Sequence, residues 1–270
     1  MEILPEIAHL LGEIKNKKPL IHHITNYVTV NDCANMTLAI GASPVMADDI
    51  EEVAEMVSFA SSLVINIGTL NSRSIESMLT AGKQAQKKGI PIVLDPVGVG
   101  ATQLRTATAK KIIETVHPAV IRGNMSEIKS LLGLDTAIKG VDSLADEADG
   151  EVVARKLSQH LGCVIAITGK QDIIAQGDRI CRIDNGHPLL SQVTGTGCMA
   201  TSLVACFCGV ASDLLIGAAA GVMVMGLAGE LAQQSLTTQT DIGTFRVNLF
   251  DAVGSLTAEK IIKGGRISHD

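Results

Sequence analysis

The feature that most constrains the fold is a series of short, continuous runs of Val, Ile and Leu separated by longer amphipathic segments. Strands that are apolar along their whole length are typical of a parallel sheet buried on both faces. The segment 72–88 is apolar on one side and charged on the other, which predicts a covering helix. We therefore predict an α/β protein with a largely parallel central sheet. The strand-like runs are LVINIG (63–68), IPIVLDPVG (90–98), AVIRGN (119–124), CVIAITG (163–169) and DIIAQG (172–177).

The length and composition fit one hydrophobic core. The chain has 270 residues, 46% of them hydrophobic, and a mean hydropathy of +0.32. Such a chain buries enough apolar surface to fold, which excludes a disordered protein. The acidic segment 145–150 lies between two βα units and does not resemble a linker. We therefore expect residues 1–270 to form a single domain.

Charge and aromatic content argue against nucleic acid and membrane partners. The net charge is −6, basic residues occur in runs no longer than pairs, and aromatic residues make up 2%. These features do not favour nucleic-acid binding. The apolar run 214–229 has sixteen residues, fewer than the ~20 that a membrane span needs. It predicts a buried helix in which Gly217 and Gly221 allow close packing.

The amino-terminal and cysteine patterns favour a reduced, cytoplasmic protein. The first eighteen residues mix charged and apolar residues at helical spacing, without the apolar core of a secretory signal. The six cysteines include no C-x-x-C pair and no zinc-like spacing. We therefore expect free thiols and no disulfide bonds.

Several predicted strands end in residues that can bind ligands. Asn66, Asp95, Arg122 and Thr168 lie at or near the carboxyl ends of four strands. The carboxyl ends of parallel strands are where open α/β sheets bind ligands. Gly and Asn also end strands for turn reasons alone, so each position has a purely structural alternative. Together the four ends favour one shared site.

A glycine-rich segment precedes a second predicted helix. The sequence VTGTGC (193–198) is followed by an apolar run of helical character. Amide N–H groups of Gly195, Thr196 and Gly197 at a helix start would form an anion-binding site. An ordinary loop-to-helix turn is the alternative. The chain contains neither a Walker A motif nor a complete dinucleotide fingerprint, which argues against P-loop and NAD binding.

Glu127 allows two interpretations. It follows Asn124 by three residues, where a helix begins, and this spacing is typical of a capping box. Alternatively, Glu127 lies beside Asp95 at the sheet edge, where two carboxylates can bind Mg²⁺ directly or through its waters. The sequence favours neither interpretation over the other.

Six segments occur in an order that resembles the hydroxyethylthiazole kinase family of thiamine salvage, which has a ribokinase-like fold. The resemblance extends from about residue 18 to residue 250. It implies phosphorylation of 4-methyl-5-(2-hydroxyethyl)thiazole by ATP with Mg²⁺. It also implies a homotrimer with active sites between subunits. The segments are IHHITNYVTVNDCANMTLAIGASPVM (21–46), INIGTL (65–70), LDPVGVGAT (94–102), IRGNMSEI (121–128), AITGK (166–170) and VTGTGC (193–198).

The resemblance also assigns residues to the thiazole side of the site. It places Met46 and Gly195 against the thiazole and Asn26 in the segment that forms its pocket. Cys198 occupies the position where most ribokinase-like enzymes have the Asp of a G-x-G-D motif. A cysteine there is characteristic of the thiazole kinases.

On the phosphate side, the resemblance places Arg122 and Thr168 against ATP. Asp95 and Glu127 match the positions that organise Mg²⁺ and phosphates in the superfamily. Thr196 departs from the small Ala expected at its position, although the backbone amides are unaffected. Lys170 matches no position of the family pattern and is left out of the predicted site.

Cys198 has two possible roles in phosphoryl transfer. A helix N-terminus can lower the pKa of a thiol, so Cys198 could act as a thiolate base. Alternatively, it only packs against the substrate hydroxyl and orients it. A loose transition state needs little help from a base. Our hypothesis is that positioning and anion stabilisation supply most of the rate, with Cys198 contributing on the order of 10²–10³-fold at most.

Two other functions compete with the thiazole kinase. One is a ribokinase-like enzyme for another substrate, either a kinase for a pyrimidine or pyridoxal alcohol or an ATP- or ADP-dependent dehydratase. These relatives generally have Asp at the position of Cys198, which argues against them. The other is a catalytically silent binding protein, but Asp95, Glu127, Gly195 and Gly197 are all present.

Overall fold

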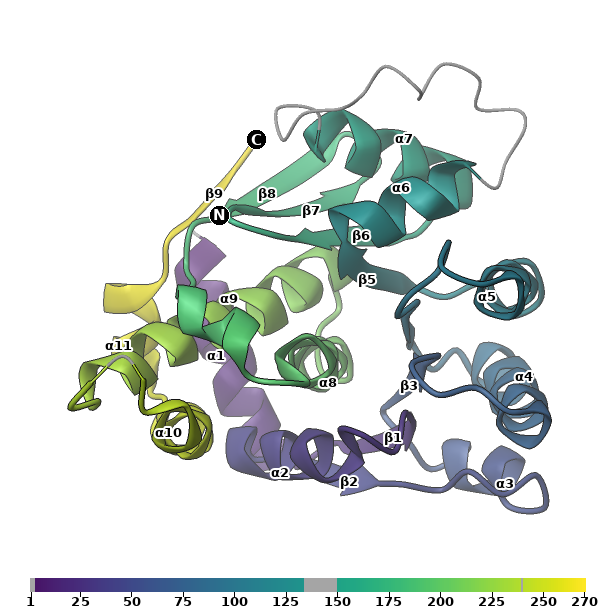
Figure 1. Ribbon diagram of the computed structural model, residues 1–270, viewed down its shortest axis with the longest axis horizontal. Coiled ribbons are helices and arrows are strands. Elements are labelled where there is room, and N and C mark those ends of the chain that lie inside the picture. The colour runs from purple at the N-terminus through teal and green to yellow at the C-terminus, as the bar shows by residue number, and fades with distance from the viewer. Residues whose placement is uncertain (1–2, 134–149, 239) are drawn as a thin grey trace.

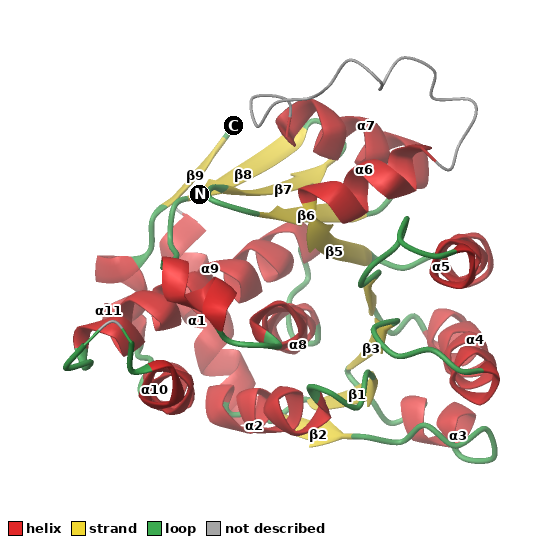
Figure 2. Ribbon diagram, viewed as in Figure 1, coloured by secondary structure: helices red, strands yellow, loops and turns green. Residues whose placement is uncertain are grey.

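The protein is built around a central sheet. In the computed structural model, residues 3–133, 150–238 and 240–270 are described, and their strands lie in the order β2-β1-β3-β4-β5-β6-β7-β8-β9. The predicted α/β class is confirmed by this sheet and the helices around it (Figure 2). The strands are β1 (Leu20–Ile24), β2 (Ser43–Val45), β3 (Ser62–Asn66), β4 (Ile92–Asp95), β5 (Val120–Asn124), β6 (Val164–Thr168), β7 (Asp172–Gln176), β8 (Arg179–Ile183) and β9 (Ile267–His269).

The sheet is parallel from β2 through β6 and antiparallel from β6 through β9. The expectation that a longer amphipathic segment separates the runs 163–169 and 172–177, as in a βα unit, is therefore wrong. Strand β6 ends at Thr168 and β7 begins at Asp172, so the connection is too short for the helix that a parallel crossover needs. The chain instead forms a hairpin. The prediction of a largely parallel sheet is confirmed.

Helices cover both faces of the sheet, as Figure 1 shows. The predicted helix over 72–88 is confirmed as α4, and it begins with a capping box between Asn71 and Ser74. One face carries α1 (Ile3–Lys17), α2 (Val30–Ile40), α8 (Thr196–Cys208), α9 (Leu214–Gln234), α10 (Ile242–Gly254) and α11 (Ala258–Gly264). The other carries α3 (Val53–Val57), α4 (Ser72–Lys88), α5 (Gln103–Val116), α6 (Met125–Gly133) and α7 (Gly150–Leu161). Of the acidic segment 145–150, residues 145–149 lie outside the described residues.

Helix α9 is a core helix. Its 21 residues exceed the sixteen of the apolar run, so by length and composition alone it could cross a membrane. Most of it is buried inside the protein, however, and Gly221 packs tightly against α8. A Cβ added at Gly221 would lie 2.4 Å from the backbone nitrogen of Val204, and one at Gly217 would lie 3.2 Å from Cys208. The predicted close packing is confirmed.

Candidate active site

The carboxyl ends of β1, β3 and β4 bring polar side chains together. Asn66 and Asp95 are the last residues of β3 and β4 and lie opposite each other in the sheet register. Asn26 follows β1, the other neighbour of β3, and all three residues are buried. The sequence prediction that these strand ends share a site is consistent with this cluster, because Asn26 donates a hydrogen bond to Asn66 (3.0 Å) and Asn66 donates one to Asp95 (2.8 Å).

Asp95 is a buried carboxylate with one free oxygen. Its Oδ2 accepts hydrogen bonds from Asn66 (2.8 Å) and from the Thr201 hydroxyl (2.9 Å). Its Oδ1 is buried and has no hydrogen-bond partner within the described ranges. Burial raises the pKa of Asp95 to about 6, opposed by the positive charge of Arg122 and reinforced by the negative charge of Glu127. A buried carboxylate oxygen without a donor is suited to a bound cation.

Glu127 is fixed by backbone hydrogen bonds. Its Oε2 accepts from the Asn124 N–H (2.9 Å) while the Asn124 side chain accepts from the Glu127 N–H (2.9 Å). This is the predicted capping box, at the start of α6. Its Oε1 accepts from the Gly98 N–H (2.9 Å), in the loop that follows β4. Glu127 therefore ties the β4 and β5 strand ends together and adds negative charge near Asp95.

These carboxylates fit a magnesium ion bound together with a nucleotide. In residues 3–133, 150–238 and 240–270, no group of three or more His, Cys, Asp or Glu side chains gathers as a metal site. Mg²⁺ is usually held by one or two carboxylates together with phosphate oxygens and waters, and it does not need such a group. The free Oδ1 of Asp95 fits this kind of binding.

Helix α8 opens onto the cluster with free amide groups. Its N-cap residue, Gly195, has φ +91° and, being glycine, supplies no side-chain cap. A Cβ at Gly195 would lie 2.6 Å from the Thr29 side chain, so this position requires glycine for both conformation and space. The first amide groups of a helix have no intrahelical acceptors. The first turn of α8 has the geometry that the predicted anion-binding role requires, and that role stays a prediction.

Cys198 lies in this first turn and touches the cluster. Its Sγ accepts hydrogen bonds from the side-chain amides of Asn26 (3.3 Å) and Asn66 (3.3 Å). Burial and the negative charge of Asp95 raise the pKa of the Cys198 thiol, although these hydrogen bonds act in the opposite direction. The site therefore disfavours the thiolate compared with a free cysteine. This favours the positioning role of Cys198 over the thiolate base.

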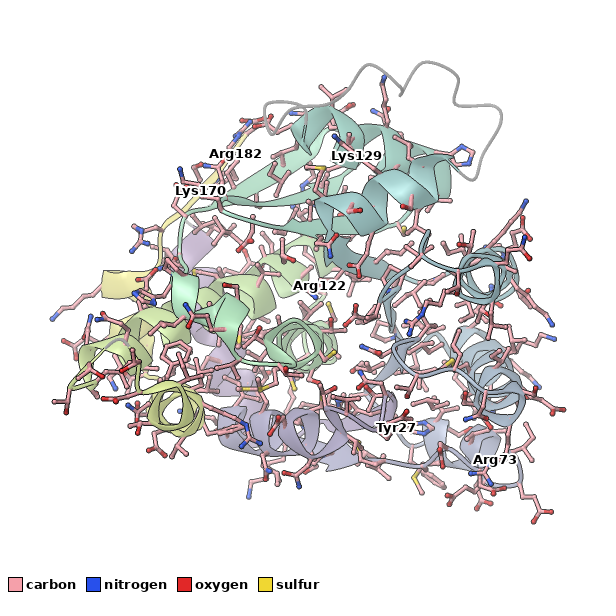
Figure 3. All side chains as sticks on the ribbon, in the orientation of Figure 1. Tyr27, Arg73, Arg122, Lys129, Lys170 and Arg182 are labelled. Atoms are coloured by element: carbon pink, nitrogen blue, oxygen red, sulfur yellow. The ribbon has the colours of Figure 1, made fainter. Side chains whose placement is uncertain are left out.

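Arg122 and Thr168 border a cavity next to α8. The Arg122 Nη2 donates to the Thr168 hydroxyl (2.6 Å), and its buried Nε has no partner in the described part of the chain. Figure 3 shows Arg122 near α8 and the sheet. The cavity has a volume of about 610 Å³, within the range of small-molecule sites. Its lining also includes Thr196 and Gly197, so two of the three predicted anion-binding residues lie there with the predicted ATP-binding residues, whereas Gly195 is not part of the lining.

Met46 lies apart from the hydrogen-bonded cluster. It is half-buried and directly follows β2, the strand at one edge of the sheet. Strand β2 is parallel to β1, so Met46 and Asn26 both follow the carboxyl ends of neighbouring strands. Met46 does not belong to the lining of the Arg122 cavity, and its assignment to the thiazole stays a prediction.

The sequence matches the hydroxyethylthiazole kinase family over residues 11–259. The chain belongs to this family. It is 52% identical to the hydroxyethylthiazole kinase of Alkaliphilus oremlandii over the full length of both chains. It is 46% identical to that of Methanocella arvoryzae, covering 94% of this chain and 95% of the relative.

Solved structures confirm the fold of this hydroxyethylthiazole kinase family member. The hydroxyethylthiazole kinase protein from Pyrococcus horikoshii has a TM-score of 0.90 and 35% identity, covering 98% of this chain and 99% of that one. A ribokinase-like superfamily protein from Enterococcus faecalis has a TM-score of 0.62 at 14% identity, covering 92% and 95%. The predicted ribokinase-like fold is therefore confirmed.

Some residues of the candidate active site were not assigned by the sequence analysis. Lys170 and Asp172 line the cavity beside Arg122, and burial raises the pKa of Asp172 to about 7. Thr201 reaches Asp95 from α8, one turn after Gly197. The signal that could have identified Thr201 is its hydroxyl within the apolar run of α8. Lining residues from distant segments are Asn185, His187, Pro188, Val222 and Met225.

We expect the variant Gly197→Ala to weaken ATP binding. A Cβ at Gly197 would lie 2.7 Å from Nη1 of Arg122, so the guanidinium must move away from its bond to Thr168. The KM for ATP is expected to rise about tenfold, equivalent to about 1.4 kcal/mol, with little change in thermal stability. Gly12→Ala is the matched control, because Gly12 lies in α1 with open space around its Cβ position. An unchanged KM in a folded Gly197→Ala protein would contradict the proposed phosphate-binding role of this turn.

Proposed function

We propose that this protein transfers the γ-phosphate of ATP to the hydroxyl of 4-methyl-5-(2-hydroxyethyl)thiazole. The observation that carries the proposal is the position of Cys198 in the first turn of α8, where it contacts Asn26 and directly follows Gly197, a residue that lines the Arg122 cavity. Membership of the hydroxyethylthiazole kinase family supports it. The products are the thiazole phosphate and ADP.

The thiazole alcohol is assigned to the side of the site formed by Asn26, Met46 and Gly195. Asn26 is buried and contacts Cys198, while Met46 supplies a half-buried apolar side chain. Gly195 leaves room beside Thr29 at the start of α8. In this arrangement the substrate hydroxyl faces Cys198 and the phosphate-binding turn.

ATP is assigned to the cavity lined by Arg122 and Thr168, with its phosphates at the first turn of α8. The protein has a net charge of −6, so attraction of ATP has to be local. Arg122 and the amides of residues Gly195, Thr196 and Gly197 supply that attraction through charge-assisted hydrogen bonds and the helix dipole. The buried, unpartnered Nε of Arg122 supports this assignment.

Asp95 and Glu127 are the residues that would hold Mg²⁺. When bound, the ion would neutralise charge on the phosphates of the nucleotide. Asp95 has a free oxygen for this purpose, whereas both Glu127 oxygens already accept backbone hydrogen bonds. Asp95 is therefore the stronger ligand of the two.

The chain's own residues position the reaction. The alcohol oxygen bonds to the γ-phosphorus while the bond from that phosphorus to the bridging oxygen of ADP breaks, and the hydroxyl proton is released. The transition state is loose, so alignment and charge stabilisation dominate. Cys198, protonated at neutral pH because its pKa is raised, orients the alcohol and need not abstract its proton.

The assembly is proposed to be a cytoplasmic homotrimer of one-domain chains, with active sites between subunits. The first and last described strands belong to one sheet, which supports one domain.

Two exposed aromatic side chains support the homotrimer. Tyr27, labelled in Figure 3, and Phe59 are 79% and 70% exposed, and Tyr27 directly follows Asn26 in the sequence. A neighbouring subunit would cover such an apolar surface. Light scattering that gives the mass of one chain would overturn the trimer.

ADP release is the direct test of the proposed activity. Purified protein is given ATP, Mg²⁺ and the hydroxyethylthiazole, and ADP is measured over time. Parallel mixtures omit the alcohol or replace it with a hydroxymethylpyrimidine. We expect turnover that requires the thiazole. Turnover only with the pyrimidine would overturn the substrate assignment while leaving the kinase fold in place.

A further inference from the structure

Asn66 connects the residues assigned to the two halves of the site. It is the last residue of β3, and its side chain is buried, with the residue only 1% exposed. Strand β3 lies between β1 and β4, so Asn66 is placed between Asn26 and Asp95. The amide of Asn66 contacts Asp95 on the phosphate side and Cys198 on the substrate side.

The backbone determines which way the Asn66 amide points. The Gly68 N–H can only donate, and it lies 2.9 Å from Oδ1 of Asn66. The oxygen end of the amide therefore faces Gly68. The Nδ2 end faces Asp95 Oδ2 (2.8 Å) and Cys198 Sγ (3.3 Å), so each of its two hydrogens has an acceptor.

The orientation of Asn26 is fixed by the same logic. Its Oδ1 accepts from the backbone N–H of Thr29 (3.1 Å), which turns its Nδ2 toward Asn66 Oδ1 (3.0 Å) and Cys198 Sγ (3.3 Å). Two amide N–H groups therefore converge on one sulfur. The sulfur acts as acceptor for both, and their directions limit the rotamers that the Cys198 side chain can adopt.

We propose that Asn66 is a positioning residue that holds Cys198 and Asp95 in a fixed relation, so that the alcohol and the phosphate are aligned for transfer. This inference rests on the proposed function. Asn66 is assigned no contact with substrate and acts through its two neighbours. A misplacement of about 1 Å at a reacting centre can cost on the order of 10²-fold in rate.

The variant Asn66→Asp tests the N–H donors of Asn66 separately from its acceptor oxygen. It keeps the shape and the oxygen that accepts from Gly68 and Asn26, and it replaces the two N–H donors with a carboxylate oxygen beside Asp95 and Cys198. We expect kcat to fall by about 10²-fold, while the KM for ATP stays within about threefold. Alkylation of Cys198 by iodoacetamide is expected to slow at least fivefold, because the reacting sulfur loses the N–H donor that Asn66 provides, and that hydrogen bond favours the thiolate.

The alkylation measurement needs no substrate and uses peptide masses to follow Cys198 alone. It therefore reports on Asn66 even if wild-type protein shows no thiazole turnover, a result that would reject the proposed function separately. Asn71→Ala is the matched control: it removes the capping box of α4, lowers stability, and should leave kcat and alkylation unchanged. Wild-type kcat or wild-type alkylation in Asn66→Asp would overturn the inference. So would losses in Asn71→Ala as large as those in Asn66→Asp.

Discussion

Asp95→Asn is expected to lower kcat by roughly 10³-fold and, at the same time, to raise the thermal stability of the ligand-free protein at neutral pH. The loss of activity follows because the proposed Mg²⁺ site loses its carboxylate ligand, so that the ion would be held less well against the phosphates. The fold tolerates the change because an Asn oxygen can accept the same bonds from Asn66 and Thr201. The new amide then occupies the place of the unpartnered Oδ1.

The gain in stability has a definite pH dependence. Burial raises the pKa of Asp95 from 3.8 to about 6 in the folded protein, so the folded state holds the charge less readily than the unfolded state does. Below about pH 4 both states are protonated and wild type has no penalty. The loss of folding free energy from burying the charged Asp95 grows between pH 4 and 6 and stays constant above pH 6. It reaches about 3 kcal/mol at most, or several degrees in Tm for a chain of this size.

Thermal melts of wild type and Asp95→Asn from pH 4 to pH 8, with a chelator and no nucleotide, measure this difference. The exposed Asp251→Asn is the control and should change neither Tm nor kcat. A variant that is less stable than wild type at pH 7 would show that the carboxylate is satisfied in the fold. Full activity in the variant would remove Asp95 from the phosphate side of the site.

The parts of the fold that depend on local patterns could be predicted from the sequence. Helix α4 spans the expected residues because its apolar stripe and its Gly89 end are both local. Helix α8 begins beside Gly195 for the same reason. The hairpin of β6 and β7 was not predicted, because β7 is as apolar as the parallel strands and only the shortness of the preceding turn distinguishes it.

The residues of the candidate site also divide into those that local sequence patterns predict and those that they do not. The strand ends at Asn66, Asp95 and Thr168 could be predicted, since parallel strands bring their carboxyl ends to one edge. The rest of the cavity comes from segments far apart in the sequence. His187 precedes a short 3₁₀ helix and Met225 lies within α9, and their approach to Arg122 depends on how α9 packs against the sheet. No local pattern encodes that packing.

Cys198→Ala is expected to retain turnover, with kcat lower by on the order of 10²–10³-fold. Burial raises the pKa of the Cys198 thiol, so the proposed mechanism assigns Cys198 a neutral, positioning role near pH 7. Removing a neutral positioning group costs alignment and leaves the anion-binding turn intact. Cys198→Asp should be more active than Cys198→Ala, because Asn26 and Asn66 can donate to its carboxylate as they do to the sulfur.

Steady-state kinetics of both variants between pH 6 and 9 decide between the two roles of Cys198. If the residue positions the alcohol, the pH dependence of kcat in Cys198→Ala follows that of wild type at a lower level. If a thiolate is required, Cys198→Ala shows no detectable turnover at any pH and the positioning account is wrong. Cys33→Ala is the matched control, because Cys33 is also buried beside Thr29 but makes no hydrogen bond to Asn66. It should lose stability and keep its kcat, which separates a packing effect from a role in alignment.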